Sequence, residues 1–205
     1  MLIENCSGGG GRFDPGMLYY SPQIWTSDNT DALERLDIQF GTSMCYPASA
    51  MGAHVSASRR TSYQTKADVA LWGSFGYELD PNKFTDAEAR TVKAQVKEYH
   101  KYYDVIHFGE LYRLISPFDG LRRRAAWMFV SEDKNEALVT SVVISKTEDR
   151  GFYLKLKGLD PEKYYVDEDT DEVYSGALLM NAGICLSHYS SDDGASLKKY
   201  FKAVE

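Results

Sequence analysis

The sequence changes its pattern near Phe108, and this change limits the possible folds more than any other feature. Before Phe108, short apolar runs alternate with stretches in which apolar residues recur every three or four positions, as on a helix. After it, apolar segments follow one another roughly every 8 to 15 residues, with Gly, Pro, Asp and Asn between them. The sequence therefore predicts two domains, residues 1–107 and residues 108–205.

The first domain is predicted to contain four short strands. They lie at residues 2–3, 21–26 and 51–56 and within residues 68–79, and their continuous apolar runs are typical of strands covered by helices. Four strand–helix units cannot easily close a parallel sheet, and a (β/α)8 barrel needs about 250 residues. The first domain therefore resembles the back half of such a barrel.

Two helices are predicted in the first domain. Asp31 with Glu34, and Thr85 with Glu88, have the spacing of residues that cap a helix start. Apolar residues at helical spacing follow each pair: Leu33, Leu36, Phe40 and Met44 after the first, and Ala89, Val92, Val96, Tyr99, Tyr103 and Ile106 after the second.

The second domain is predicted to be an antiparallel β-sandwich, because short strands are separated by turn residues at regular intervals. The expected strands are residues 125–131, 136–145, 151–157, 163–167, 175–179 and 197–202.

Charge and cysteine content exclude several classes of protein. The net charge of −7 disfavours nucleic-acid binding, and the cluster at residues 122–124 is interpreted as a solvated basic turn. No signal peptide and no apolar run long enough for a membrane span is seen, so a cytoplasmic protein is expected. Cys6, Cys45 and Cys185 have neither metal-site nor disulfide spacing. We expect reduced thiols, no metal and no cofactor.

Residues 8–11 are four consecutive glycines, directly after Cys6 and Ser7. They lack the Lys-Ser/Thr of a phosphate-binding loop and the strand–helix setting of a dinucleotide fingerprint. Two interpretations stay open. The run is either a flexible loop or a loop whose backbone approaches a ligand closely, because glycine has no Cβ to block contact.

Asp28 and Asp31 stand between a predicted strand and a predicted helix. An aspartate here commonly caps the helix, but in a barrel the strand ends also face the active site. Both roles stay open from spacing alone. His54, at the end of another predicted strand, is interpreted as a loop histidine with its hydrogen bonds satisfied.

Four motifs, taken in order, resemble the α-galactosidases of glycoside hydrolase family 36. The motifs are residues 4–14 (ENCSGGGGRFD), 25–32 (WTSDNTDA), 51–56 (MGAHVS) and 73–80 (GSFGYELD). The resemblance covers essentially the whole chain. It implies barrel strands 5–8 followed by the family's C-terminal β domain.

The resemblance also implies a chemistry. Family members hydrolyse terminal α-linked galactose, as in melibiose and raffinose-type oligosaccharides, with retention of configuration and with two carboxylates. By motif, Asp28 matches the acid/base. Cys6, Gly8 and Gly9 match positions that line the galactose pocket, and Trp25 matches its wall.

One departure from the family is large. The family's nucleophile is the aspartate of a Lys-Trp-Asp motif, and this sequence contains no such motif. We therefore expect a fragment, from a truncated gene, an incomplete gene sequence or an expressed piece, that is inactive by itself. The alternative is a non-catalytic module that binds carbohydrate or complements the N-terminal portion of the same enzyme. A homo-oligomer is a further possible assembly.

Overall fold

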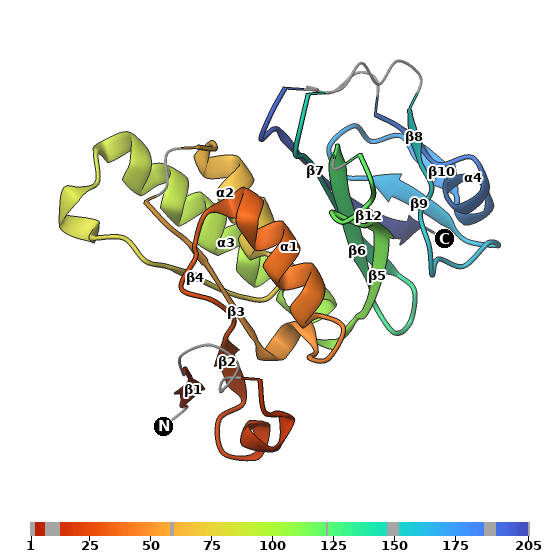
Figure 1. The fold of residues 1–205 in the computed structure, drawn as a ribbon. Helices are drawn as coiled ribbons and strands as arrows, with labels where there is room; N and C mark the ends of the chain where they lie inside the picture. The colour runs from red at the N-terminus through yellow and green to blue at the C-terminus, as the bar shows by residue number, and fades with distance from the viewer. Residues whose placement is uncertain are drawn as a thin grey trace. The chain divides into compact units, whose positions relative to one another are not determined.

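The computed structural model describes residues 3–6, 13–57, 60–121, 123–146, 152–186 and 192–204. The chain divides into two compact units, Met1–Tyr103 and Asp104–Glu205. The division falls inside the long helix α3 (Asp86–Phe108), which can be followed in yellow to green in Figure 1. Each unit is described separately.

The first unit contains a parallel sheet of four strands in chain order. The strands are β1 (Glu4–Asn5), β2 (Gln23–Trp25), β3 (Met51–Val55) and β4 (Ser74–Tyr77), and each pairs in parallel with the next. The strands predicted at residues 21–26 and 51–56 are confirmed. The stub expected at residues 2–3 is found two residues later, as β1.

Two helices start where their capping residues predict. α1 (Ala32–Thr42) begins after Asp31, whose Oδ1 accepts hydrogen bonds from the backbone N–H groups of Leu33 and Glu34 at 3.1 and 3.4 Å. At the start of α3, Thr85 and Glu88 form a reciprocal capping box. Both start signals are thereby confirmed.

The prediction for residues 68–79 is wrong in part. Most of that apolar run does not form a strand, because Val69 and Ala70 end the helix α2 (Tyr63–Ala70) and Trp72 is fully buried in the turn after it. Only residues from Ser74 onward pair with β3. A helix was not expected here, so the strand–helix alternation is more regular than the sequence pattern indicated.

The register of the parallel strands assigns side chains to two faces of the sheet. On one face, Ala53 and Val55 of β3 pack against Ala67 and Ala70 of α2 in a buried apolar cluster. On the other face lie the side chains of alternate residues in register with one another. They are Glu4, Gln23, Trp25, His54 and Ser74, with glycines at positions 52 and 76. One face is therefore apolar and covered, and the other is polar and aromatic.

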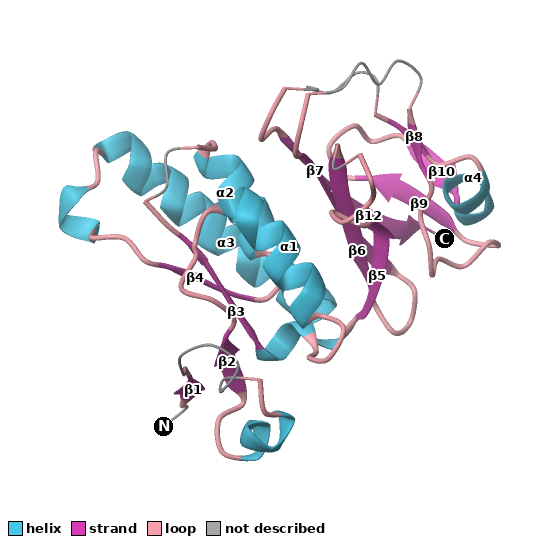
Figure 2. Ribbon diagram, viewed as in Figure 1, coloured by secondary structure: helices cyan, strands magenta, loops and turns pink. Residues whose placement is uncertain are grey.

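The second unit is built on antiparallel strands (Figure 2). Its main sheet has six strands in the order β10-β9-β12-β7-β6-β5, and a second sheet pairs β11 with β8. The bounds are β5 (Glu110–Ile115), β6 (Arg124–Val130), β7 (Glu136–Val143), β8 (Tyr153–Leu154), β9 (Tyr164–Asp167), β10 (Val173–Ser175), β11 (Ile184–Cys185) and β12 (Ser196–Val204).

The helix α4 (Gly176–Asn181) corrects a prediction in the second unit, because residues 175–179 were expected to form a strand. Of the strand expected over residues 151–157, only β8 (Tyr153–Leu154) is found, and β5 was not expected. The antiparallel character of the domain is confirmed. Its core contains the fully buried Met128, Tyr165 and Phe201, together with Leu179 of α4.

Short 3-10 helices complete the described structure: η2 (Pro15–Tyr19), η3 (Ala48–Ala50) and η4 (Pro81–Lys83). No helix in the described ranges is both long and apolar enough to cross a membrane.

Candidate functional site

The carboxyl ends of the four parallel strands meet at one edge of the first unit's sheet. Cys6 directly follows β1, Thr26 follows β2, Ser56 follows β3 and Glu78 follows β4. In parallel α/β sheets, ligands bind at this edge, because the loops that leave the strand ends converge there. The candidate site is therefore built from the loops at this edge.

The loop of residues 26–31 connects β2 to α1 and carries both candidate aspartates. Asp31 forms the cap of α1, and its side chain is only 12% exposed. Asp28 lies three residues earlier and is exposed. The structure thus assigns the helix cap to Asp31, whereas Asp28 presents an exposed carboxyl group in the loop after β2.

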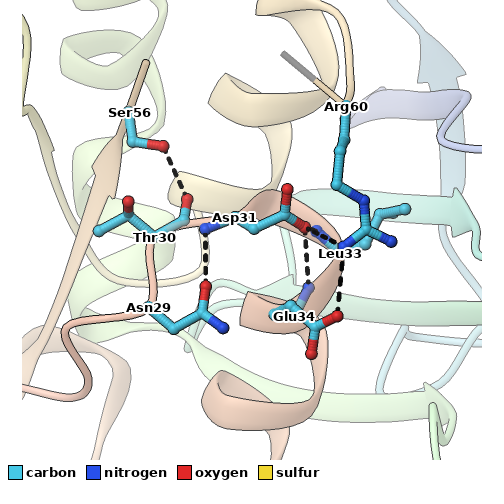
Figure 3. A network of polar contacts seen from close by, with 7 residues as sticks. All are labelled: Asn29, Thr30, Asp31, Leu33, Glu34, Ser56 and Arg60. Atoms are coloured by element: carbon cyan, nitrogen blue, oxygen red, sulfur yellow. Dashed lines mark hydrogen bonds and ion pairs between the residues drawn. The ribbon is translucent and has the colours of Figure 1, made fainter. Parts of the chain in front are cut away.

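The second half of this loop is held by a network of polar contacts, drawn in Figure 3. Asn29 Oδ1 accepts from the backbone N–H of Asp31 at 3.1 Å, and Ser56 Oγ donates to the carbonyl oxygen of Thr30 at 2.8 Å. Arg60 Nη1 lies 3.3 Å from both Asp31 Oδ1 and Glu34 Oε1. The loop is therefore fixed to the end of β3 just downstream of Asp28.

The first half of the loop is held by Arg35 of α1, which is 2% exposed. Its Nη2 donates to the carbonyl oxygen of Ser27 at 2.9 Å, and its Nη1 donates to Thr26 Oγ1 and to the carbonyl oxygen of Gly52 at 3.3 Å. Its guanidinium carbon also lies 4.4 Å from the ring centroid of Trp25. Arg35 therefore contacts three consecutive residues immediately before Asp28.

Trp25 lies on the polar face of the sheet, 7% exposed, with its ring centroid 4.7 Å from that of His54. Two glycines leave room for this pair of rings. A Cβ at Gly52 would lie 2.9 Å from Trp25 Cε3, and a Cβ at Gly76 would lie 2.6 Å from His54 Cδ2. The sheet is thus shaped around two neighbouring rings whose planes are tilted by 39°, and Trp25 directly precedes the Asp28 loop.

His54 is a strand residue of β3, so the expectation of a loop histidine is wrong. Burial lowers its pKa, and the charge of Arg35 acts in the same direction, while Glu4 and Glu78 oppose the shift. The closest carboxylate oxygen, Glu78 Oε1, is 3.8 Å from His54 Nδ1. The neutral imidazole is favoured, which suits a ring that packs against an indole.

The other predicted pocket residues differ in what the structure shows. Cys6 is exposed directly after β1, the strand that neighbours β2. Gly8 and Gly9 lie outside the described residues. In the described part of the chain, no group of three or more His, Cys, Asp or Glu side chains could hold a metal ion.

Sequence reasoning missed Arg35 and did not anticipate the packing of His54. A usable signal existed for Arg35, because a charged residue stands among the apolar positions that α1 buries, next to Leu36. Such a residue needs buried partners.

Two family models match this chain and identify the family to which it belongs. Residues 1–109 match the family model described as Melibiase, and residues 124–198 match the glycosyl hydrolase family 36 C-terminal domain. The chain belongs to the melibiase family. The resemblance noted from the four sequence motifs is thereby confirmed, and the two matched regions follow the order of the parallel and antiparallel units.

Melibiase-family relatives match the whole length of this chain. It is 52% identical to alpha-galactosidase AgaA of Geobacillus stearothermophilus over 212 residues, and 50% identical to alpha-galactosidase Mel36A of Lactobacillus acidophilus over 211. The match covers 100% of this chain but 28% of each relative. A crystal structure of an AgaA variant in complex with raffinose superposes with a TM-score of 0.93 at 51% identity, covering 29% of that chain. The chain thus spans less than a third of the length of these relatives.

Proposed function

We propose that this chain is the part of a retaining α-galactosidase that carries the general acid/base, Asp28. In this proposal the parallel sheet is the back half of a (β/α)8 barrel, with β1 to β4 as barrel strands 5 to 8, and the antiparallel unit is its C-terminal β-sandwich domain. The observation that carries the proposal is the exposed Asp28 carboxyl group, on a loop fixed on both sides at the carboxyl edge of the sheet.

The proposed reaction has two steps. In the first, a nucleophilic carboxylate attacks the anomeric carbon of galactose, the glycosidic C–O bond breaks, and the Asp28 carboxyl proton passes to the leaving oxygen. In the second, the Asp28 carboxylate takes a proton from water, and the resulting hydroxide displaces the enzyme's carboxylate from the galactosyl ester. The nucleophile belongs to a segment beyond residues 1–205, because the sequence has no Lys-Trp-Asp motif.

The proposed substrates are oligosaccharides that end in α-linked galactose. AgaA variants have been crystallised with raffinose and with stachyose, and this chain is about half identical to AgaA. Trp25 ends β2, three residues before Asp28, and Cys6 follows the neighbouring strand β1. We assign these two residues, with Gly8 and Gly9 by motif, to the galactose pocket. The cytoplasmic location remains a prediction.

The test uses a completed enzyme, made by substituting this chain for the matching segment of AgaA. The Asp28→Asn variant should lose about 10²- to 10⁴-fold in kcat/KM for raffinose, because general acid catalysis contributes about that much. A nitrophenyl α-galactoside should lose less, since its leaving group needs little protonation, and azide should restore part of the turnover. An Asp28→Asn enzyme with unchanged raffinose hydrolysis would remove Asp28 from the mechanism.

The chain by itself should not hydrolyse a nitrophenyl α-galactoside, because no covalent intermediate can form without the nucleophile. Activity that appears when the chain is mixed with the rest of AgaA would favour the complementing module. Turnover by the purified chain alone would contradict the proposed division of the two carboxylates.

A further inference from the structure

We infer that Arg35 is a positioning residue for the acid/base Asp28. The inference rests on the proposed role of Asp28 and adds a residue that acts through the backbone rather than on the sugar. Arg35 comes from α1, on the far side of the loop in sequence, and it reaches back to the residues that precede Asp28. The geometry points to a guanidinium group that fixes the acid/base and the aromatic wall relative to each other.

The contact with Ser27 gives the most direct argument. The Ser27 carbonyl belongs to the peptide group that joins Ser27 to Asp28, and a peptide group is planar. A hydrogen bond of 2.9 Å from Arg35 Nη2 to this oxygen therefore fixes the orientation of the plane from which the Asp28 backbone starts. The plane of this peptide group sets the direction in which the exposed Asp28 side chain leaves the backbone.

The other contacts of Arg35 tie this peptide to two neighbours. Nη1 donates both to Thr26 Oγ1 and to the carbonyl oxygen of Gly52, so the loop is joined to β3. The guanidinium also lies over Trp25, at 4.4 Å from the ring centroid. A planar fork with several fixed donors suits this task, and a lysine ammonium on a flexible stem cannot reproduce it.

The Asp28 loop is also held by Ser56, and comparison of the two contacts shows what Arg35 adds. Downstream of Asp28, the loop is held by Ser56 through the carbonyl of Thr30, as Figure 3 shows. Two peptide groups separate Asp28 from that bond, but Arg35 holds the adjacent one. Removing Arg35 should therefore displace Asp28 more than removing Ser56, and a displacement of about 1 Å can cost about 100-fold in rate.

The test measures leaving-group dependence in the completed enzyme. Arg35→Gln should lower kcat/KM about 100-fold for raffinose, whose leaving oxygen needs a proton, and less than about tenfold for a nitrophenyl α-galactoside. Arg35→Lys should give an intermediate loss, because one donor can replace part of the fork. A merely structural role would lower both substrates in the same proportion.

Gln39→Leu is the matched control. Gln39 is a buried polar residue one turn further along α1, and its Nε2 donates to the carbonyl oxygen of Val69 at 3.0 Å, away from the Asp28 loop. It should change the two substrates equally. An Arg35→Gln enzyme with an unchanged substrate ratio, or a Gln39→Leu enzyme with the same altered ratio, would overturn the inference.

Two measurements keep the inference testable if Arg35→Gln does not fold. Thr26→Val removes one acceptor of Arg35 without changing the arginine, and it should shift the substrate ratio in the same direction by a few-fold. In the 205-residue chain, Arg35→Lys should speed amide hydrogen exchange at Asp28 and Asn29 more than Gln39→Leu does. Unchanged ratios in both Thr26→Val and Arg35→Lys would reject a positioning role. Absence of any galactosidase activity in the unmutated completed enzyme would instead reject the proposed function.

Discussion

Arg35 in the first unit and Lys199 in the second are both almost fully buried, at 2% and 5% exposure, but their surroundings differ. The hydrogen bonds described for Arg35 go to neutral oxygens of the loop and of β3. Lys199, on β12, forms an ion pair with Asp167 of β9 at 2.8 Å, and Asp167 is equally buried. The contacts described for the two buried cations thus differ: neutral oxygens surround the Arg35 guanidinium, and a carboxylate lies against the Lys199 ammonium.

The difference separates a contact that shapes a site from a contact that stabilises a sheet. A carbonyl oxygen accepts best near the plane of its peptide group, so the guanidinium favours one orientation of the Ser27 and Gly52 peptide planes. The Lys199–Asp167 pair joins two adjacent strands of an antiparallel sheet whose register is already set by backbone pairing. We therefore expect mutations at Lys199 to change stability, and mutations at Arg35 to change geometry as well.

The largest effect is expected at the ion pair. Lys199→Met should lower the free energy of unfolding of the second unit by about 3–5 kcal/mol, because a buried carboxylate loses its partner. The double variant with Asp167→Leu should regain most of the loss. Urea unfolding with unit-resolved hydrogen exchange measures both. A double variant as unstable as Lys199→Met would mean that lost packing, rather than the unpaired charge, dominates.

A smaller loss is expected from Arg35→Met, about 1–3 kcal/mol in the first unit, because the change removes a donor from several buried acceptors. Unlike the ion pair, this loss should not be relieved by a single second substitution, since the acceptors include two backbone carbonyls. Hydrogen exchange in α1 and β2 would record the change. A loss as large as that of Lys199→Met would remove the contrast between the two units.

The two aspartates of the site loop should differ by about 1 kcal/mol. Asp31→Ala removes the cap of α1 and should cost about that amount in stability. Asp28→Ala should stay within about 0.5 kcal/mol, because the residue is exposed. Thermal unfolding of the two variants, compared with the unmutated chain, tests the separation. Equal losses would mean that Asp28 also has a structural role.

The smallest effect is a change in pH dependence. Burial holds the pKa of His54 below its usual 6.5, so the unfolded chain binds this proton first as the pH falls. The contribution of His54 to stability is complete above pH 6.5 and declines below it, through the folded-state pKa. His54→Gln should make the acid-side decline of stability shallower. Thermal unfolding at a series of pH values, compared with the unmutated chain, measures this slope.

The sequence predicted elements best where their apolar residues follow one period. α1 and α3 have such a period and a capping residue, and both were found. α2 was missed because its buried residues include Thr65, Lys66 and Asp68, so no apolar stripe marks the helix. The short apolar run of α4 fits a strand as well as a helix. In the structure, the backbone N–H of Leu178 donates to Ser175 Oγ, and this N-cap bond stabilises the helix.

The candidate site could be predicted only in part for a related reason. Motif resemblance pointed to Asp28 and Trp25, but spacing alone could not separate Asp28 from the helix cap at Asp31. That separation depends on which carboxylate reaches the free N–H groups of α1, which is a question of loop geometry. Arg35 was outside any motif argument, because its partners are backbone carbonyls that no side-chain pattern encodes.

The two glycines of the sheet have a consequence for engineering. The ring of Trp25 occupies the space of a missing methyl at Gly52, and the ring of His54 occupies that of Gly76. These four positions lie on three strands. Because each ring needs the space left by its glycine, a ring and the glycine it faces must be exchanged together. A graft that transfers Trp25 or His54 to another parallel sheet must bring the facing glycine with it, and alanine at either glycine should displace the ring it faces.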